Sequence, residues 1–197
     1  DRALVTTYMA TFGVIISCAI GFTVGTVCFQ NKHTTNFMLG VCDIFQTFPS
    51  FVYLIPVMML FGVTDTSVLI AVVVYATIPA TRYTIEGLRS VPASLHDAAS
   101  MSGVTKIQRL MKIEFPLAFP HMMLGLNQTI VFALFMVIIG AFIGTEDLGQ
   151  YILKALSDKN GAGIGLTLGL CVAFIGLVFD HLIRTWVNKR KKHLGID

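Results

Sequence analysis

The side chains that could do chemistry gather in one stretch of this chain, residues 91–120. They are His96, Asp97, Lys106, Arg109, Lys112 and Glu114. Residues 4–29, by contrast, contain no charged side chain at all. Acids and bases on a short segment suit ion pairing and hydrogen bonding with a partner in water. We interpret the stretch as a docking element, but an amphipathic hairpin resting on lipid headgroups, favoured by the basic residues, fits equally well.

Local signals divide this polar stretch into two short helices. Ser94, with Asp97 three residues later, predicts the start of a helix over residues 95–102. Gly103 is the residue best suited to the left-handed turn that ends such a helix. Thr105 can cap a second helix, whose apolar stripe would be Ile107, Leu110 and Met111. We therefore expect a rigid protrusion, with Pro116 and Pro120 marking the return to the apolar part of the chain.

A second group of candidates interrupts the apolar runs. A carboxylate inside a membrane is costly and often marks a pathway, yet Asp43 lies close enough to a helix end for a structural role. Aromatic rings beside Pro49 could line a path for a cation, although such rings more often pack or anchor at the interface. The possible pathway residues are Phe48, Phe51, Tyr53, Asn127 and Gln128.

The composition predicts an all-α integral membrane protein. Hydrophobic residues make up 55% and charged residues 13% of the 197 residues, and the mean hydropathy is +0.76. A soluble domain carries about 25% charged residues. The net charge of +3 gives little support to nucleic-acid binding. The four cysteines, Cys18, Cys28, Cys42 and Cys171, form no CxxC pair, so we expect free thiols and no metal site.

Apolar runs of roughly 20 residues predict spanning helices. We expect five spans in one domain, over about residues 4–29, 37–63, 67–84, 122–144 and 162–186. Two prolines in the second span, Pro49 and Pro56, predict a broken or kinked helix. Gly21 and Gly25 form a GxxxG face for close packing, and Gly161, Gly165 and Gly169 repeat that spacing. Because residue 1 is Asp and not Met, we expect the chain to begin inside a longer one.

Charge asymmetry predicts the orientation of these spans. Five spans place the two ends of the chain on opposite sides. Eleven of the 14 Lys and Arg residues then fall on the side that holds the polar stretch and the C-terminal tail, and the other three are Arg2, Lys154 and Lys159. Positive charge stays on the cytoplasmic side. We therefore expect the polar stretch and the C-terminus inside, and the N-terminal end outside.

The spacing within the polar stretch resembles a family signature. Asp97-Ala98-Ala99, three residues, Gly103, nine residues and then Ile113 to Pro116 is similar to the EAA motif of ABC-importer permeases, EAA-x3-G-x9-I-x-L-P. The departures are Asp97 for Glu and Phe115 for Leu. In that family the motif forms the coupling helix that sits in a groove of the ATPase subunit. The residues that the resemblance assigns to ATPase coupling are Ser94, Leu95, His96, Asp97, Ala98, Ala99, Met101, Gly103, Lys106, Arg109, Ile113 and Pro116.

Further segments narrow the resemblance. Residues 39–62, 125–129 and 147–150 look like the corresponding parts of glycine betaine/proline-type permeases. The resemblance implies a type I (MetI-like) fold in a bacterial inner membrane and uptake of a quaternary amine. It also implies two ATPase subunits that use ATP and Mg, a second permease copy or paralogue, and a periplasmic or tethered binding protein. The substrates consistent with it are glycine betaine, proline betaine, choline, carnitine and trimethylamine N-oxide.

Two other functions stay open at this point. A secondary transporter driven by ions would usually show repeated halves and ionisable groups at the membrane midplane. A non-transporting membrane scaffold would explain the docking stretch but not the kinked, polar-interrupted spans. The chain has no G-x-x-x-x-G-K-[ST] loop. We therefore expect it to bind no cofactor and not to be an enzyme itself, with ATP hydrolysis in a partner.

Overall fold

The computed structural model describes residues 2–142, residue 154 and residues 162–194. These residues form helices and connecting turns and contain no strand, as the composition predicts. The sequence also suggests a short helix at the membrane surface within residues 144–161, but this segment lies outside the described residues, apart from Lys154. Three helices are long and apolar enough to cross a membrane, or four when one bent pair is counted as a span. The fifth predicted span stays a prediction.

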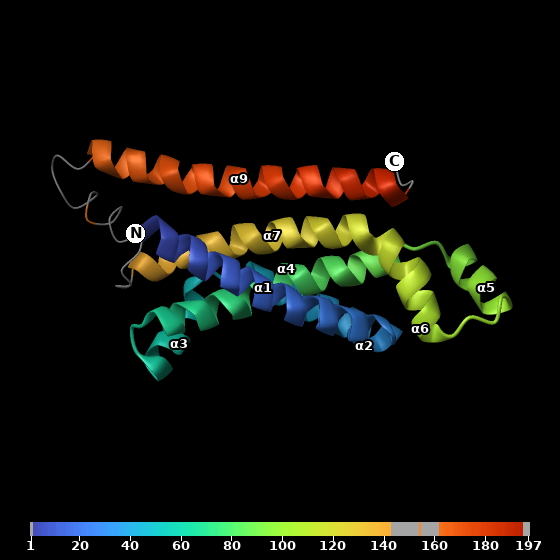
Figure 1. The fold of residues 1–197 in the computed structure, drawn as a ribbon. Helices are drawn as coiled ribbons and strands as arrows, with labels where there is room; N and C mark the ends of the chain where they lie inside the picture. Colours follow the sequence, from blue (N-terminus) through green and yellow to red (C-terminus); the bar gives the residue numbers. More distant parts are fainter. Residues whose placement is uncertain (1, 143–153, 155–161, 195–197) are drawn as a thin grey trace.

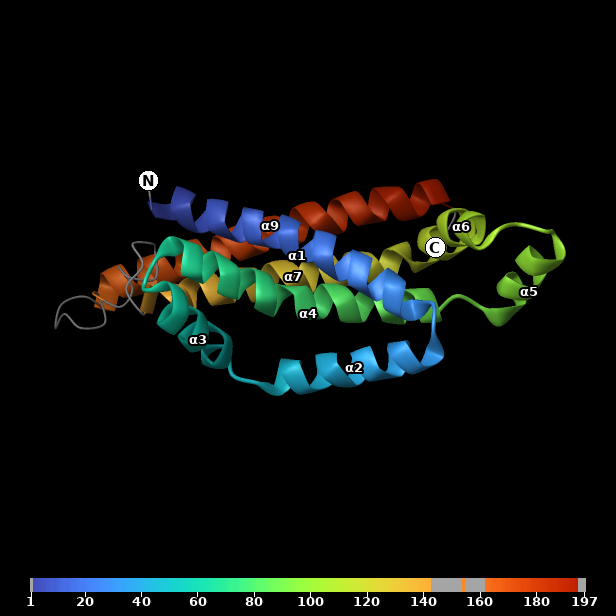
Figure 2. The ribbon, with the colours of Figure 1, turned by 90° about the horizontal axis from the view of Figure 1, so that it is seen from below.

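Three long helices form the body of the molecule. They are α1 (Arg2–Phe29), α4 (Asp65–Arg89) and α7 (Phe115–Phe142). α4 packs against both α1 and α7 (Figures 1 and 2). Glycine allows the closest approach, since a Cβ at Gly21 would lie 2.4 Å from the Cβ of Ala80, and one at Gly25 would lie 2.7 Å from the Cβ of Thr84. The predicted close contact through the Gly21–Gly25 face is thereby confirmed.

The second apolar run is broken, as its prolines predict. α2 (Lys32–Thr47) and α3 (Phe51–Phe61) meet at an angle of 86°. The break falls at Pro49, which has no N–H to continue the helix, whereas Pro56 lies inside α3. The Tyr53 hydroxyl donates a hydrogen bond across the break to the carbonyl of Phe45. This bond holds the bend in one geometry.

The third span is longer than the sequence suggested. We predicted residues 67–84, but α4 continues to Arg89. The prediction ended the span near Arg82 because charged side chains are rarely placed in lipid. The structure pairs Arg82 with Asp43 and Glu86, so the helix continues through it. The positive charge of Arg82 is thus neutralised by two acidic side chains, and the helix does not need to end before it.

The last helix, α9 (Ala162–Leu194), runs along α7 (Figure 1). Its apolar part, Gly163–Val178, is shorter than the other candidate spans. A Cβ at Gly169 would meet no described atom within 4 Å. The described residues thus give Gly169 no close neighbour, and tight packing at this glycine stays a prediction.

The polar stretch extends from one end of this bundle. It comprises α5 (Ala93–Met101), α6 (Lys106–Arg109) and the π-helix η1 (Leu110–Glu114). α5 projects beyond the long helices at the end where α1 and α9 finish, and α1 begins at the opposite end (Figure 1). A small apolar cluster of Leu88, Ala118, Met122 and Met123 packs α7 against α4 at this end. The protrusion is therefore attached to a well-packed end of the bundle.

The return to the bundle differs from expectation. We placed the start of the fourth span near residue 122, after Pro116 and Pro120, but helical structure runs without a break from Lys106 through α7. A proline ring clashes with the carbonyl four residues earlier in a regular α-helix. The wider π-turn of η1 changes that register immediately before Pro116, because the amide of Phe115 bonds the carbonyl of Leu110. The second half of the polar stretch is therefore an extension of a long helix.

Candidate functional site

The first helix of the protrusion begins earlier than predicted. Pro92 occupies the N-cap position with φ −58°, and no side chain caps the helix there. Ser94 lies inside the first turn, so its predicted capping role is wrong. Proline restricts the backbone at this position, and its carbonyl accepts a hydrogen bond from the Leu95 backbone amide at 3.0 Å, so the helix begins here without a side-chain cap. Ser94 and Asp97 are both exposed and available to a partner.

The corner after α5 has the predicted geometry. Gly103 has φ +70°, a left-handed conformation that glycine adopts without strain. Beyond it, the Gln108 amide donates to the Thr105 hydroxyl at 3.3 Å, and the Thr105 amide donates to the Gln108 side-chain oxygen at 2.9 Å. This reciprocal pair is a capping box and confirms Thr105 as the cap of α6. The turn and the direction of the second helix are both determined locally.

A buried acid joins the two halves of the protrusion. The Glu114 side chain is only 3% exposed, and its Oε1 accepts from Arg109 Nε at 2.9 Å. The same oxygen lies 3.1 Å from His96 Nδ1 on α5. Because a buried carboxylate is stable only when it is paired, these contacts hold α5 near the base of α7. The interaction is formed by one acidic side chain and two basic ones.

The π-helix explains how Arg109 reaches Glu114. In an α-helix the neighbours on one face are three or four residues apart, whereas the π-turn repeats after five. Arg109 and Glu114 are five residues apart, and the wide turn between them brings their side chains together. π-Bulges often lie at functional sites. The resemblance assigned His96 and Arg109 to ATPase coupling but gave Glu114 no such role, although Glu114 is the only acid in residues 98–145.

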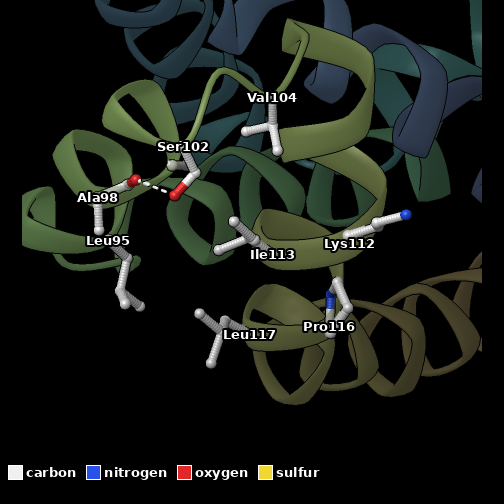
Figure 3. Close-up of a pocket in the computed structure, with 9 residues that line it drawn as sticks. Leu95, Ala98, Ser102, Val104, Lys112, Ile113, Pro116 and Leu117 are labelled. Atoms are coloured by element: carbon white, nitrogen blue, oxygen red, sulfur yellow. Dashed lines mark hydrogen bonds between the residues drawn. The ribbon is translucent and has the colours of Figure 1, made fainter.

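An apolar groove separates α5 from the start of α7. It has a volume of about 450 Å³. Figure 3 shows Leu95 and Ala98 on one side of it and Ile113 and Leu117 on the other. The Lys112 amine points away from the groove (Figure 3). The remaining lining residues are Ala99, Ser102, Val104 and Pro116.

A second hollow adjoins the His96–Glu114 contact. Its volume is about 630 Å³, and it is bounded by the end of α1 and by α6. Among its lining residues are Phe29, Gln30, His96, Lys106, Arg109 and Glu114. α5 is thus bordered by two open spaces, and its one buried residue is Ala99, which is 4% exposed. Met101, at the end of α5, is 90% exposed.

The twelve candidate coupling residues therefore lie in one region but in different surroundings. Five line the groove: Leu95, Ala98, Ala99, Ile113 and Pro116. Three line the second hollow: His96, Lys106 and Arg109. Ser94, Asp97, Met101 and Gly103 are exposed at the tip. A surface of this kind can present a short helix to a partner while its inner face stays attached to the bundle.

The candidate pathway residues are not brought together. Tyr53 is buried, with its ring 5.1 Å from that of Tyr75, so it packs in the core. Phe48 and Phe51 are exposed on either side of the α2–α3 break. Asn127 and Gln128 are both half-buried on α7. Of the five, Gln128 alone lines a pocket with charged residues, namely Arg82 and Glu86.

The described part of the chain offers no metal site. It contains no group of three His, Cys, Asp or Glu side chains that could hold an ion. Cys18, Cys28 and Cys42 are buried free thiols, and Cys171 is an exposed one.

Among the curated proteins that resemble this chain in sequence are two transport permeases. The trimethylamine N-oxide transport system permease protein TmoV of Pelagibacter ubique (strain HTCC1062) is 91% identical over 196 residues. Those residues are 100% of this chain and 27% of that protein. The glycine betaine transport system permease protein OpuAB of Bacillus subtilis (strain 168) is 32% identical over 195 residues, which are 99% of this chain and 68% of that protein. The chain thus spans less than a third of the Pelagibacter relative.

The fold also has a solved counterpart. An inward-facing structure of the MetNI methionine ABC transporter matches 96% of this chain and 94% of the compared chain, with a TM-score of 0.84 and 18% identity. This likeness confirms the expected MetI-like fold. A family model described as the binding-protein-dependent transport system inner membrane component matches residues 13–193. Since that match covers nearly all of the membrane helices and the whole protrusion, the chain belongs to this family of inner-membrane transport components.

Proposed function

We propose that the chain is the membrane-spanning permease part of an ATP-driven importer that carries a small trimethylated amine into the cytoplasm. The observation that carries the proposal is the protrusion itself. A short helix, α5, exposes Asp97 and Met101 at its surface and turns at Gly103 into a helix continuous with α7. In a chain of this family, such an element suits a cytoplasmic ATPase.

The partners follow from this role. α5 enters a groove of an ATPase subunit, and a second permease, a copy or a paralogue, presents an equivalent helix to a second ATPase. ATP and Mg are bound by those subunits. A periplasmic or tethered binding protein delivers the substrate at the opposite membrane face. The end of the bundle that carries the protrusion is cytoplasmic, and the end where α1 begins lies outside, in agreement with the distribution of Lys and Arg.

Coupling uses the rigid connection between α5 and α7. When ATP draws the two ATPases together, α5 moves with the groove that holds it. The His96–Glu114–Arg109 contacts transmit that movement to η1 and α7, because Glu114 is buried and paired on both sides. α7 packs against α4, so the displacement reaches the centre of the bundle. The bundle then changes from inward-open to outward-open.

The names of the two sequence relatives support the substrate class. One is named for trimethylamine N-oxide and the other for glycine betaine. Both compounds carry a trimethylammonium group and an oxyanion, so they share the chemistry that a pathway must accommodate. We assign trimethylamine N-oxide as the substrate, because the relative named for it is 91% identical to this chain.

Cross-linking tests the docking role. In the complete permease, Met101→Cys is combined with single cysteines along the groove of the ATPase subunit, and disulfide formation is measured. Met59→Cys is the matched control, since Met59 is also a methionine, is 82% exposed and lies on α3 away from the protrusion. We expect a disulfide with Met101→Cys alone. Cross-linking only through Met59→Cys would contradict the docking role.

Uptake tests the transport function. The permease, ATPase and binding protein are reconstituted in vesicles, and entry of labelled trimethylamine N-oxide is followed with and without ATP. Uptake that requires ATP and is competed by trimethylamine N-oxide more strongly than by glycine betaine supports the proposal. Uptake driven by an ion gradient without ATP would instead identify a secondary transporter. An ATPase that binds without any uptake of the amine panel would identify a scaffold.

A further inference from the structure

A charged cluster joins α2 to α4 inside the membrane-spanning part of the chain. Arg82 on α4 donates through Nη1 to Asp43 and, at 2.8 Å, to Gln46 on α2. Its Nε donates to Glu86 at 2.9 Å, one turn further along α4. One guanidinium thus meets two carboxylates, which gives the cluster a formal charge of −1. This cluster belongs to none of the coupling contacts described above.

The cluster is open at its surface. The side chains of Arg82, Asp43 and Glu86 are 31%, 59% and 37% exposed. Arg82 lies seven residues before the end of α4, which is about 10 Å along the helix axis. Charged side chains inside a membrane face a water-filled cavity or the interior of a bundle, because lipid cannot solvate them. This face of α2 and α4 therefore does not meet lipid.

A polar pocket adjoins the cluster. It has a volume of about 360 Å³, within the range of small-molecule sites. Its lining comes from three helices and includes Gln46, Arg82, Tyr83, Glu86, Gln128 and Phe132. The pocket therefore combines a guanidinium, a carboxylate, two amides and two aromatic rings in one small space. It lies beside the α4–α7 contact, which moves in the coupling scheme.

This set of groups matches a small zwitterion with a methylated cationic end. Guanidinium N–H groups and amides donate to an oxyanion. Aromatic rings and a carboxylate attract a trimethylammonium group. Several weak contacts of this kind suit passage, because a transport site must bind strongly enough to admit a solute and weakly enough to release it.

We propose that this pocket is a binding station for the solute within the translocation pathway. The inference rests on the proposed function and assigns its substrate contacts. Arg82, Gln46 and Gln128 receive the oxyanion of trimethylamine N-oxide, and Glu86 with the rings of Tyr83 and Phe132 faces its methylated nitrogen. Asp43 keeps Arg82 in position when the station is empty.

Cysteine labelling in the complete transporter tests the station. Gln46→Cys and Gln128→Cys are made singly, so that Arg82 and the other glutamine still receive the oxyanion, in a subunit whose Cys171 and other reactive thiols are replaced by serine. Each variant is treated with a small trimethylammonium thiol reagent, with and without saturating trimethylamine N-oxide. We expect rapid modification at both positions and a several-fold slower reaction when the amine is present.

Two control positions define the background. Ile20→Cys on α1 lies at about the same depth as Arg82, because the neighbouring Gly21 packs against Ala80 and Thr81. Ile20 is 41% exposed. It should react slowly with or without the amine. Gln30→Cys lies in the hollow at the end of α1 and should react rapidly with no protection by the amine. Together they separate access by water from protection by the solute.

The outcomes decide between the station and its alternatives. Pocket cysteines that react as slowly as Ile20→Cys would show a face covered by protein, and the station would be overturned. Rapid reaction without protection would show a water-filled vestibule with no binding, which also overturns it. Wild-type uptake measured in parallel keeps the two proposals apart. If the wild type takes up no trimethylamine N-oxide, the proposed function fails, whereas loss of protection alone rejects only the station.

Discussion

His96 Nδ1 on α5 lies 3.1 Å from Glu114 Oε1 at the end of η1, across the corner formed by Gly103. Glu114 is almost fully buried and His96 is about a quarter exposed. The contact therefore connects the exposed helix α5 to the base of α7 through a buried side chain. In the proposed coupling, the protrusion then moves together with α7 and not as a tethered loop.

Removing the acid should uncouple ATP hydrolysis from transport. Glu114→Ala leaves His96 and Arg109 without their shared acceptor, at a loss of about 1–3 kcal/mol in the attachment of α5. We expect substrate transported per ATP hydrolysed to fall while the ATPase still binds. The measurement is uptake and phosphate release on the same vesicles. Lys112→Ala is the control, since its amine points away from the groove (Figure 3), and a similar drop in both variants would contradict this role.

Replacing Gly103, the glycine at the corner after α5, should lower ATP-driven uptake. A non-glycine residue with positive φ is strained by roughly 1–2 kcal/mol, so Gly103→Val should distort the direction of α5. Gly62→Val is the matched control, since Gly62 has φ +80° and a Cβ at either glycine would meet no described atom within 4 Å. Both variants should lose similar thermal stability. Only Gly103→Val should lower ATP-driven uptake, and equal uptake in the two would argue against the corner.

The capping box of Thr105 and Gln108 should keep α6 from unfolding locally. Thr105→Ala removes the acceptor for the Gln108 amide, which is worth about 1 kcal/mol. We expect faster amide hydrogen exchange over residues 106–109 in the assembled complex, with little change in α4. Thr105→Ser retains the hydroxyl and should exchange like the wild type. Unchanged exchange in Thr105→Ala would mean that the continuous helix with α7, and not the cap, orders this turn.

Substitution by alanine should destabilise the protein at Gly21 and stabilise it at Gly40. A Cβ at Gly21 would lie 2.4 Å from the Cβ of Ala80, so Gly21→Ala should separate α1 from α4 at a cost of about 1–3 kcal/mol. Gly40 lies inside α2, and a Cβ there would meet no described atom within 4 Å. Gly40→Ala should therefore stabilise, because alanine favours a helix by about 1 kcal/mol. Thermal unfolding in detergent compares the two, and equal shifts would contradict the packing.

The sequence predicted those features that depend on near neighbours in the chain. Apolar run length predicted membrane helices, Pro49 predicted the break between α2 and α3, and Gly103 predicted the left-handed corner. Thr105 was identified as a cap because its partner, Gln108, is only three residues away. Helix bounds were less accurate, since Ser94 was given a cap position that Pro92 occupies.

The tertiary structure alone revealed which charged groups meet. Glu114 pairs with His96, 18 residues earlier, and Arg82 pairs with Asp43, 39 residues earlier. Neither pairing follows from local spacing, because each depends on how two separate helices are brought together. The sequence by itself determined that this is a helical membrane protein with a polar protrusion. Only packing decided that a buried acid attaches that protrusion and that a charged cluster lies between α2 and α4, since an ionic group in such a protein is stable only where its partners are placed.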